Sequence, residues 1–100
     1  MNNKRIYESI YIVKGTLQNE EYKKVLEDLK KQFENIEIKK IKELGIKNLA
    51  YEVMHYKKGY FINVEFRATE QEVLELERYC RIKDVILKYC ILKKYNRRTK

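Results

Sequence analysis

The sequence is poor in the residue types from which most enzyme sites are built. Its 100 residues include one histidine, two cysteines and three glycines. No nucleophile and orienting carboxylate accompany His55 at a recognisable spacing, so the pattern expected for nucleophilic catalysis is missing. One histidine with two distant cysteines does not provide a metal site, and three isolated glycines cannot form a phosphate-binding loop. We therefore expect no catalytic residue, metal, cofactor or small-molecule substrate, and we interpret His55 as a solvated turn residue.

The sequence also has no long apolar run. No segment approaches the roughly 20 apolar residues that a membrane-spanning helix needs. The N-terminal stretch resembles a signal peptide only superficially, because Glu8 and Ser9 interrupt it and no small-residue cleavage site follows. We therefore expect a cytoplasmic protein with no membrane partner. Cys80 and Cys90 belong to no C-x-x-C pair, and we expect both to be buried free thiols in a reducing compartment.

Positive charge, by contrast, is abundant. The chain carries 23 Lys and Arg residues against 15 Asp and Glu residues, which gives a net charge of +8 at pH 7. The charge is unevenly distributed, because residues 70–77 are acidic whereas residues 88–100 contain basic residues and no acidic one. An excess of this size predicts a polyanionic partner such as nucleic acid.

Hydrophobic spacing divides the first half of the chain into a strand, a helix and a second strand. Residues 6–13 are apolar at both alternating sets of positions, which is typical of a central strand. Residues 19–34 repeat apolar side chains every three or four positions, which predicts an amphipathic helix capped by Asn19 or Thr16. Residues 36–44 predict a highly charged edge strand with a bulge near Lys39 and Lys40. Gly45 permits a bend, and strand character resumes to residue 53.

The second half of the chain repeats this alternation. Gly59 begins a third predicted strand, which runs to residue 67 with Tyr60 on its core-facing side. Thr69 and Glu72 have the spacing of a capping box, in which each side chain accepts a hydrogen bond from the other residue's backbone N–H at the start of a helix. Residues 84–93 predict the last strand, again apolar at both alternating sets of positions.

The predicted order is β-α-β-β-α-β, which is the arrangement of the α+β ferredoxin-like fold. Two right-handed crossovers then place both helices on one face of a four-stranded antiparallel sheet. We expect a single domain over residues 1–94 and a short basic C-terminal tail over residues 95–100. The other face of the sheet is left open, so the apolar residues Ile10, Ile12 and Phe61 predict a protein or nucleic-acid partner that covers them.

One alternative comes from the residues around Gly59, which can be compared with a strand motif of RNA-recognition domains. Lys58, Gly59 and Tyr60 fit the first three positions of that motif, whereas the next three residues fit none. Tyr60 also shares its side of the strand with Val64, which favours an ordinary core strand. A stand-alone single-stranded RNA-binding module of this type stays as the alternative. Acylphosphatase-like chemistry is disfavoured because residues 13–19 contain no arginine.

Four pieces of the sequence occur together in one known family. R-I-Y-E opens the first strand, E-L-G-I-K-N-L-A-Y crosses the second, G-Y-F begins the third and R-I-K-D precedes the last. With these pieces in this order and spacing, over residues 5–94, the chain resembles the bacterial small-subunit ribosomal protein S6 family. The segment E-L-G-I-K-N-L-A-Y is the most specific of the four.

The resemblance implies a ferredoxin-like fold without catalytic activity. It also implies a structural role in the small ribosomal subunit, where family members bind the central domain of small-subunit ribosomal RNA as a heterodimer with ribosomal protein S18. In the family the second strand and its hairpin help to form the partner surface. Carried over to this chain, and with Phe61 added from the open sheet face, the partner-binding set is Lys42, Glu43, Lys47, Asn48, Tyr51 and Phe61.

This segment departs from the family pattern at two positions. Asn48 stands where a second basic residue is common, and Glu52 stands where proline is common.

RNA contact is expected from basic side chains that neutralise phosphates. The residues expected to make this contact are Arg5, Lys57, Lys58, Arg81, Lys83, Arg97 and Arg98.

Overall fold

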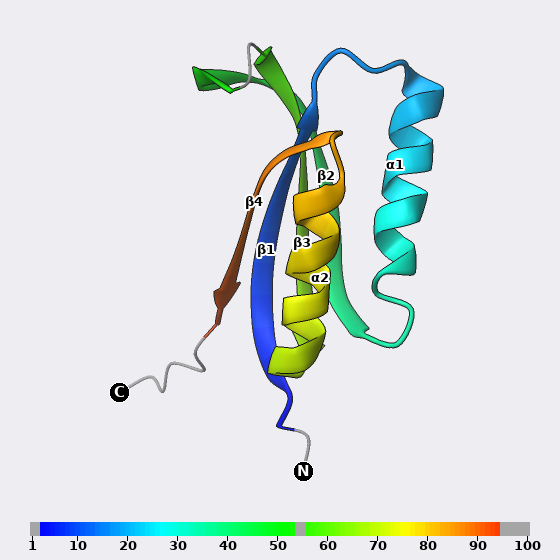
Figure 1. Cartoon of the computed structure of the whole chain (residues 1–100), viewed down its shortest axis with the longest axis vertical. Helices are drawn as coiled ribbons and strands as arrows, with labels where there is room; N and C mark the ends of the chain where they lie inside the picture. The colour runs from blue at the N-terminus through cyan, green and yellow to red at the C-terminus, as the bar shows by residue number, and fades with distance from the viewer. Residues whose placement is uncertain (1–2, 54–55, 95–100) are drawn as a thin grey trace.

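Four strands and two helices follow one another in the predicted order (Figure 1). The structure is a computed structural model that describes residues 3–53 and 56–94. The elements are β1 (Arg5–Lys14), α1 (Asn19–Lys31), β2 (Glu37–Val53), β3 (Tyr56–Ala68), α2 (Glu70–Ile82) and β4 (Ile86–Lys93). The predicted β-α-β-β-α-β fold is therefore confirmed.

The four strands form one antiparallel sheet in the order β2-β3-β1-β4. β1 lies between β3 and β4, as its apolar residues on both sides predict. β2 and β4 are the two edges of the sheet. Lys14 at the end of β1 pairs with Gly59, so the part of the β2–β3 hairpin beyond this pair projects past β1 (Figure 1). We call residues 48–53 and 56–58 the hairpin arm.

Both helices cover the same face of the sheet. Alternate residues of β1 and β3 point to that face, and Tyr11, Val64 and Phe66 are completely buried there. Phe66 packs edge-on against Phe33, with ring centroids 5.1 Å apart. Leu29 of α1 also belongs to this core. Because burying a large apolar side chain stabilises the fold by about 1.5–3 kcal/mol, these side chains hold the helices on the sheet.

The boundaries of α1 differ from the prediction at both ends. α1 begins after Gln18, whose backbone N–H donates to the Glu21 carboxylate at 2.7 Å, so Asn19 is helical and the predicted cap at Asn19 or Thr16 is wrong. α1 ends at Lys31, not at residue 34. The apolar repeat continues to Phe33 because that side chain enters the core from a turn, in which the Phe33 N–H donates to the Lys30 carbonyl at 2.9 Å.

The capping box of α2 is confirmed. The Glu72 N–H donates to the Thr69 hydroxyl at 3.2 Å, and the Thr69 N–H donates to the Glu72 carboxylate at 2.9 Å. These bonds satisfy two backbone donors that would otherwise have no partner within the helix. The start of α2 is therefore fixed by local sequence.

β2 is one strand of 17 residues that accommodates the predicted irregularities without breaking. Its register with β3 shifts between Ile38 and Lys40, which confirms the predicted bulge. A second shift lies between Glu43 and Gly45, and Gly45 has a φ of 85°, which only glycine adopts easily. β3 begins at Tyr56, earlier than predicted, because it pairs with the end of β2 in the hairpin arm.

Candidate nucleic-acid and partner interface

The open face of the sheet carries a mixture of apolar and basic side chains. Ile12 lies opposite Phe61 of β3 and opposite Lys88 of β4. Ile10 is 38% exposed and Leu92 is 63% exposed, although both belong to strands of the sheet. An exposed apolar sheet surface of this kind is typical of an interaction site.

A small cluster over Gly59 makes this surface compact. A Cβ atom added at Gly59 would lie 2.5 Å from Cγ2 of Ile12 and 3.2 Å from Cδ2 of Leu49. The Phe61 ring lies against the same position, with Cε1 at 3.6 Å. Glycine is therefore required here because the side chains of Ile12, Leu49 and Phe61 close over its backbone. We call these three side chains the open-face cluster.

Cys90 lies on the same face, opposite Ile10, and it is exposed. The expectation that both cysteines are buried is wrong for Cys90, because its side chain lies on the open face, which the helices do not cover. Cys80 of α2 is buried, and both cysteines are free thiols. Burial raises the pKa of the Cys80 thiol to about 12, with a smaller contribution from the Glu77 carboxylate.

The predicted partner-binding residues lie along the β2 edge but on both of its sides. Lys42 and Lys47 pair with Asn63 and Gly59, which places them on the open face. Tyr51 is 83% exposed on the hairpin arm, and Asn48 begins that arm opposite Lys58. Within the described residues the outer side of β2 pairs with no other strand. Phe61, from the neighbouring strand, lies in the open-face cluster.

Glu43 is on the other side of β2, toward the helices. Its carboxylate accepts a hydrogen bond from the Tyr60 hydroxyl. This hydrogen bond, together with partial burial, raises the pKa of Tyr60 to about 12. The Tyr60 ring stacks on Tyr22 of α1 with centroids 4.5 Å apart. Tyr60 packs against the core, so its interpretation as a core position is confirmed.

The predicted RNA-binding residues are not brought together at one place. Arg81 and Lys83 lie at the end of α2, and Lys57 and Lys58 lie on the hairpin arm. Arg5 begins β1, about 30 Å along the strand from Lys14. Arg97, Arg98 and the histidine His55 lie outside the described residues.

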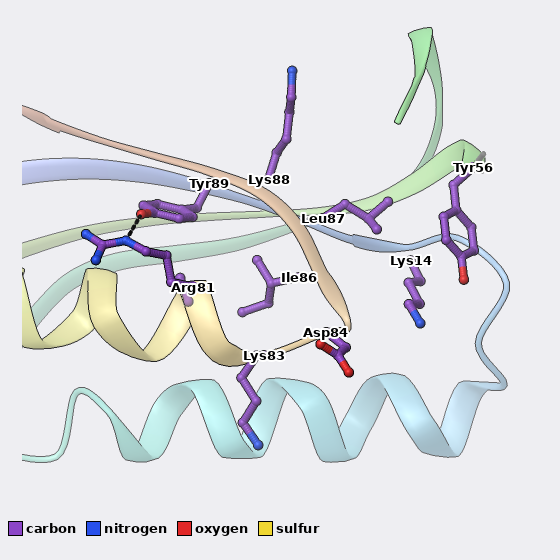
Figure 2. A pocket seen from close by; sticks show the side chains of 10 residues that line it. Lys14, Tyr56, Arg81, Lys83, Asp84, Ile86, Leu87, Lys88 and Tyr89 are labelled. Atoms are coloured by element: carbon purple, nitrogen blue, oxygen red, sulfur yellow. Dashed lines mark hydrogen bonds between the residues drawn. The ribbon is translucent and has the colours of Figure 1, made fainter. Parts of the chain in front are cut away.

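A basic groove opens where the end of β1, the hairpin arm, the end of α2 and the start of β4 meet (Figure 2). Its volume is about 710 Å³. The groove contains two of the predicted residues, Arg81 and Lys83, and eight that the prediction did not include. The lining residues are Lys14, Tyr56, Cys80, Arg81, Lys83, Asp84, Ile86, Leu87, Lys88 and Tyr89. We call this site the basic groove.

Backbone geometry shapes the basic groove. The Lys14 N–H donates to the Val85 carbonyl at 2.9 Å, which joins the end of β1 to the loop before β4. Ile86 pairs with Val13 and Lys88 pairs with Ile12, so Leu87 is the extra residue of a bulge. Bulges of this kind redirect side chains and are common beside functional sites.

Two tyrosines position cations in the groove. The Lys14 ammonium lies 5.5 Å from the centroid of the Tyr56 ring. The Arg81 Nε donates to the Tyr89 hydroxyl at 3.4 Å, as the dashed line in Figure 2 indicates. The predicted fold contained one signal for this site. β1 and β4 are neighbours in a ferredoxin-like sheet, and their antiparallel pairing places Lys14 near the start of β4.

In residues 3–53 and 56–94, no helix is long and apolar enough to cross a membrane. The same residues contain no group of three or more His, Cys, Asp or Glu side chains that could hold a metal ion.

The fold and its uncovered surfaces define a class of protein, namely a small basic ferredoxin-like domain with one open sheet face and a charged edge strand. Comparison with known families identifies the family within that class. The family model described as Ribosomal protein S6 matches residues 6–93. The chain therefore belongs to the ribosomal protein S6 family.

Individual relatives agree with this assignment. The chain is 37% identical over 91 residues to small ribosomal subunit protein bS6 of Helicobacter acinonychis, a match that covers 89% of this chain and 64% of the relative. It is 34% identical to the bS6 protein of Nitratiruptor sp., with 71% of that relative covered. The chain thus spans less than two thirds of the length of the Helicobacter relative.

A solved structure shares the fold. The crystal structure of 30S ribosomal protein S6 from Thermotoga maritima superposes on this chain with a TM-score of 0.86 and 28% sequence identity. The superposition covers 92% of this chain and 89% of that structure. The predicted family and the predicted fold are both confirmed.

Proposed function

We propose that this protein is a structural constituent of the small ribosomal subunit that binds the central domain of small-subunit ribosomal RNA together with ribosomal protein S18. The observation that carries the proposal is the family match over residues 6–93. The net charge of +8 and the uncovered sheet surfaces support it, because they suit an RNA partner and a protein partner respectively.

Binding to RNA would depend mainly on phosphate neutralisation. Each Lys or Arg that contacts a phosphate releases condensed counterions, so affinity falls steeply with salt. The protein would recognise the shape and backbone of folded RNA more than base edges. The proposed contacts are Arg5, Lys57, Lys58, Arg81 and Lys83, with Arg97 and Arg98 beyond the described residues.

Binding to S18 would use the β2 edge. The outer side of a strand edge offers backbone donors and acceptors to a partner. Lys42 and Lys47 flank this edge on the open face, whereas Glu43 lies on the helix side. A partner that contacts this whole set would therefore wrap over the edge, with Tyr51 and Asn48 of the hairpin arm at one end and Phe61 beside it.

The position of Tyr60 supports this proposal over a stand-alone single-stranded RNA-binding module. In the recognition motif an exposed aromatic ring stacks on a base. In this protein the Tyr60 ring stacks on Tyr22, and its hydroxyl donates a hydrogen bond to the Glu43 carboxylate. The ring is therefore engaged on the helix side of the sheet.

The proposal is tested by measuring the affinity of the full chain for central-domain ribosomal RNA with and without S18. We expect weak binding alone, strong binding with S18 and a steep loss of affinity with added salt. Lys42→Glu with Lys47→Glu should weaken S18 binding, whereas Lys23→Glu with Lys24→Glu on the exposed side of α1 is the matched control. Tight RNA binding without S18, or no binding with it, would contradict the proposal.

A further inference from the structure

We propose that the basic groove binds a single-stranded stretch of RNA, with backbone phosphates on Lys14 and Arg81 and an unpaired base on Tyr56. This inference rests on the proposed function, since it names where and in what form the ribosomal RNA contacts the protein. These three residues come from β1, α2 and β3, and β4 completes the groove, so the site exists only in the folded chain.

Charge favours an anionic ligand at this site. Four cations line the groove, Lys14, Arg81, Lys83 and Lys88, against one lining carboxylate, that of Asp84. A second carboxylate, that of Glu77, lies outside the lining and 3.9 Å from the Arg81 guanidinium. A groove lined mainly by one sign of charge concentrates ligands of the opposite sign. A second hollow has the opposite character, with Glu34, Glu72 and Glu75 against Lys31. An RNA backbone is therefore directed to the basic groove and away from that hollow.

Aromatic side chains favour an unpaired nucleotide over phosphate alone. Figure 2 shows Tyr89 from β4 and Tyr56 from the hairpin arm at two ends of the groove, with Leu87 between them. Proteins that bind single-stranded RNA combine a positively charged groove with aromatic rings on which bases stack. The Lys14 ammonium beside the Tyr56 ring supplies both features at one point.

The volume of the basic groove and the position of its cations also suit a single-stranded RNA segment. Its volume of about 710 Å³ is comparable to sites that hold small ligands, so it accommodates a short extended segment. The hydrogen bond from Arg81 to Tyr89 holds the guanidinium against one wall, and the backbone bond from Lys14 to Val85 holds the other cation near the loop. Cations positioned before binding lose less conformational entropy when they contact a phosphate.

The experiment measures the affinity of variants of the full chain for central-domain ribosomal RNA in the presence of S18. We expect Lys14→Gln and Arg81→Gln each to weaken binding several-fold and to reduce the salt slope by about one. Tyr56→Leu should weaken binding about fivefold or more through lost stacking, whereas Tyr56→Phe should retain affinity. Lys23→Gln on α1 is the matched charge control, and Asp84→Asn should strengthen binding.

The outcomes separate this inference from the proposed function. Failure of the unmodified protein to bind RNA with S18 would overturn the proposed function itself. The groove assignment alone would be overturned if the unmodified protein binds RNA normally and the Tyr56→Leu and Arg81→Gln variants both bind it with the same affinity as Lys23→Gln. Ultraviolet crosslinking of the unmodified complex needs no variant, so it applies even where a substitution unfolds the chain. RNA crosslinks at Tyr56 or Tyr89 are expected, and crosslinks confined to other elements would contradict the assignment.

Discussion

The two faces of the sheet are built from alternate residues of the same strands, yet they differ in what they do. On the helix side, Tyr11, Val64 and Phe66 are completely buried. On the open side, Ile10 and Leu92 keep 38% and 63% of their surface exposed. Apolar residues on both sides of a strand therefore stabilise this fold on one face and remain accessible on the other.

Truncation on the helix side should produce the largest effect. Phe66→Ala removes a ring that packs against Phe33 and Tyr7, and we expect it to lower the free energy of unfolding by about 3–5 kcal/mol. Urea unfolding followed by circular dichroism measures this loss. A cost below about 1 kcal/mol would show that the helix side does not carry the stability of the fold.

The equivalent truncation on the open side should separate stability from binding. Phe61→Ala removes a half-buried ring, so we expect a smaller stability loss of about 1–2 kcal/mol. The same change should weaken S18 binding about tenfold, because aromatic side chains contribute much of the binding free energy at many interfaces. Calorimetric titration measures the affinity, with Phe66→Leu as a control for general destabilisation. Unchanged S18 affinity would contradict a binding role for the open-face cluster.

The two cysteines report on the same two surfaces. Cys90 is exposed on the open face, and Cys80 is on the buried side of α2. Because the thiolate is the reactive form, and burial raises the pKa of Cys80, a thiol reagent should modify Cys90 rapidly in the native protein and Cys80 only on unfolding. Mass spectrometry identifies the modified residue. Rapid modification of Cys80 in native buffer would show that the helix side opens easily.

The last expected effect is a loss of stability that appears only at alkaline pH. The pKa of Cys80 rises from an ordinary 9.0 to about 12 in the folded state. Its contribution to stability is therefore complete below about pH 9 and declines as pH rises toward 12, because the unfolded thiol ionises first. Urea unfolding at increasing pH should show this decline. The Cys80→Ala variant should show a shallower decline, and an identical slope would contradict the assignment to Cys80.

Much of the fold could be predicted from the sequence because its signals are local. The side of the strand on which Tyr11 and Val13 lie follows from alternation, and the start of α2 follows from the Thr69 capping box. The end of α1 could not be predicted from periodicity, because Phe33 continues the helical repeat from a turn. The exposure of Cys90 could not be predicted from apolar spacing, because residues 84–93 are apolar at both alternating sets of positions and Cys90 lies on the open face.

The candidate site was less predictable than the fold, because residues far apart in the sequence form it. Basic charge indicated Arg81 and Lys83, but the basic groove also needs Lys14 and Tyr56. Tyr56 reaches the groove because β3 begins earlier than its apolar pattern indicates. Lys14 reaches it because the bulge at Leu87 and the bond to Val85 shape the start of β4. These are long-range features, which emerge only when strand register is known.

The most direct measurement is the solvent protection of side chains in the complex of this protein with S18 and central-domain ribosomal RNA. Oxidative footprinting of the free and assembled protein reports this protection residue by residue. We expect assembly to protect Phe61 on the open face and Tyr56 in the basic groove, whereas the protection of Tyr22 on α1 should be the same in the free and the assembled protein. Unchanged oxidation of Phe61 and Tyr56 in a fully assembled complex would contradict it.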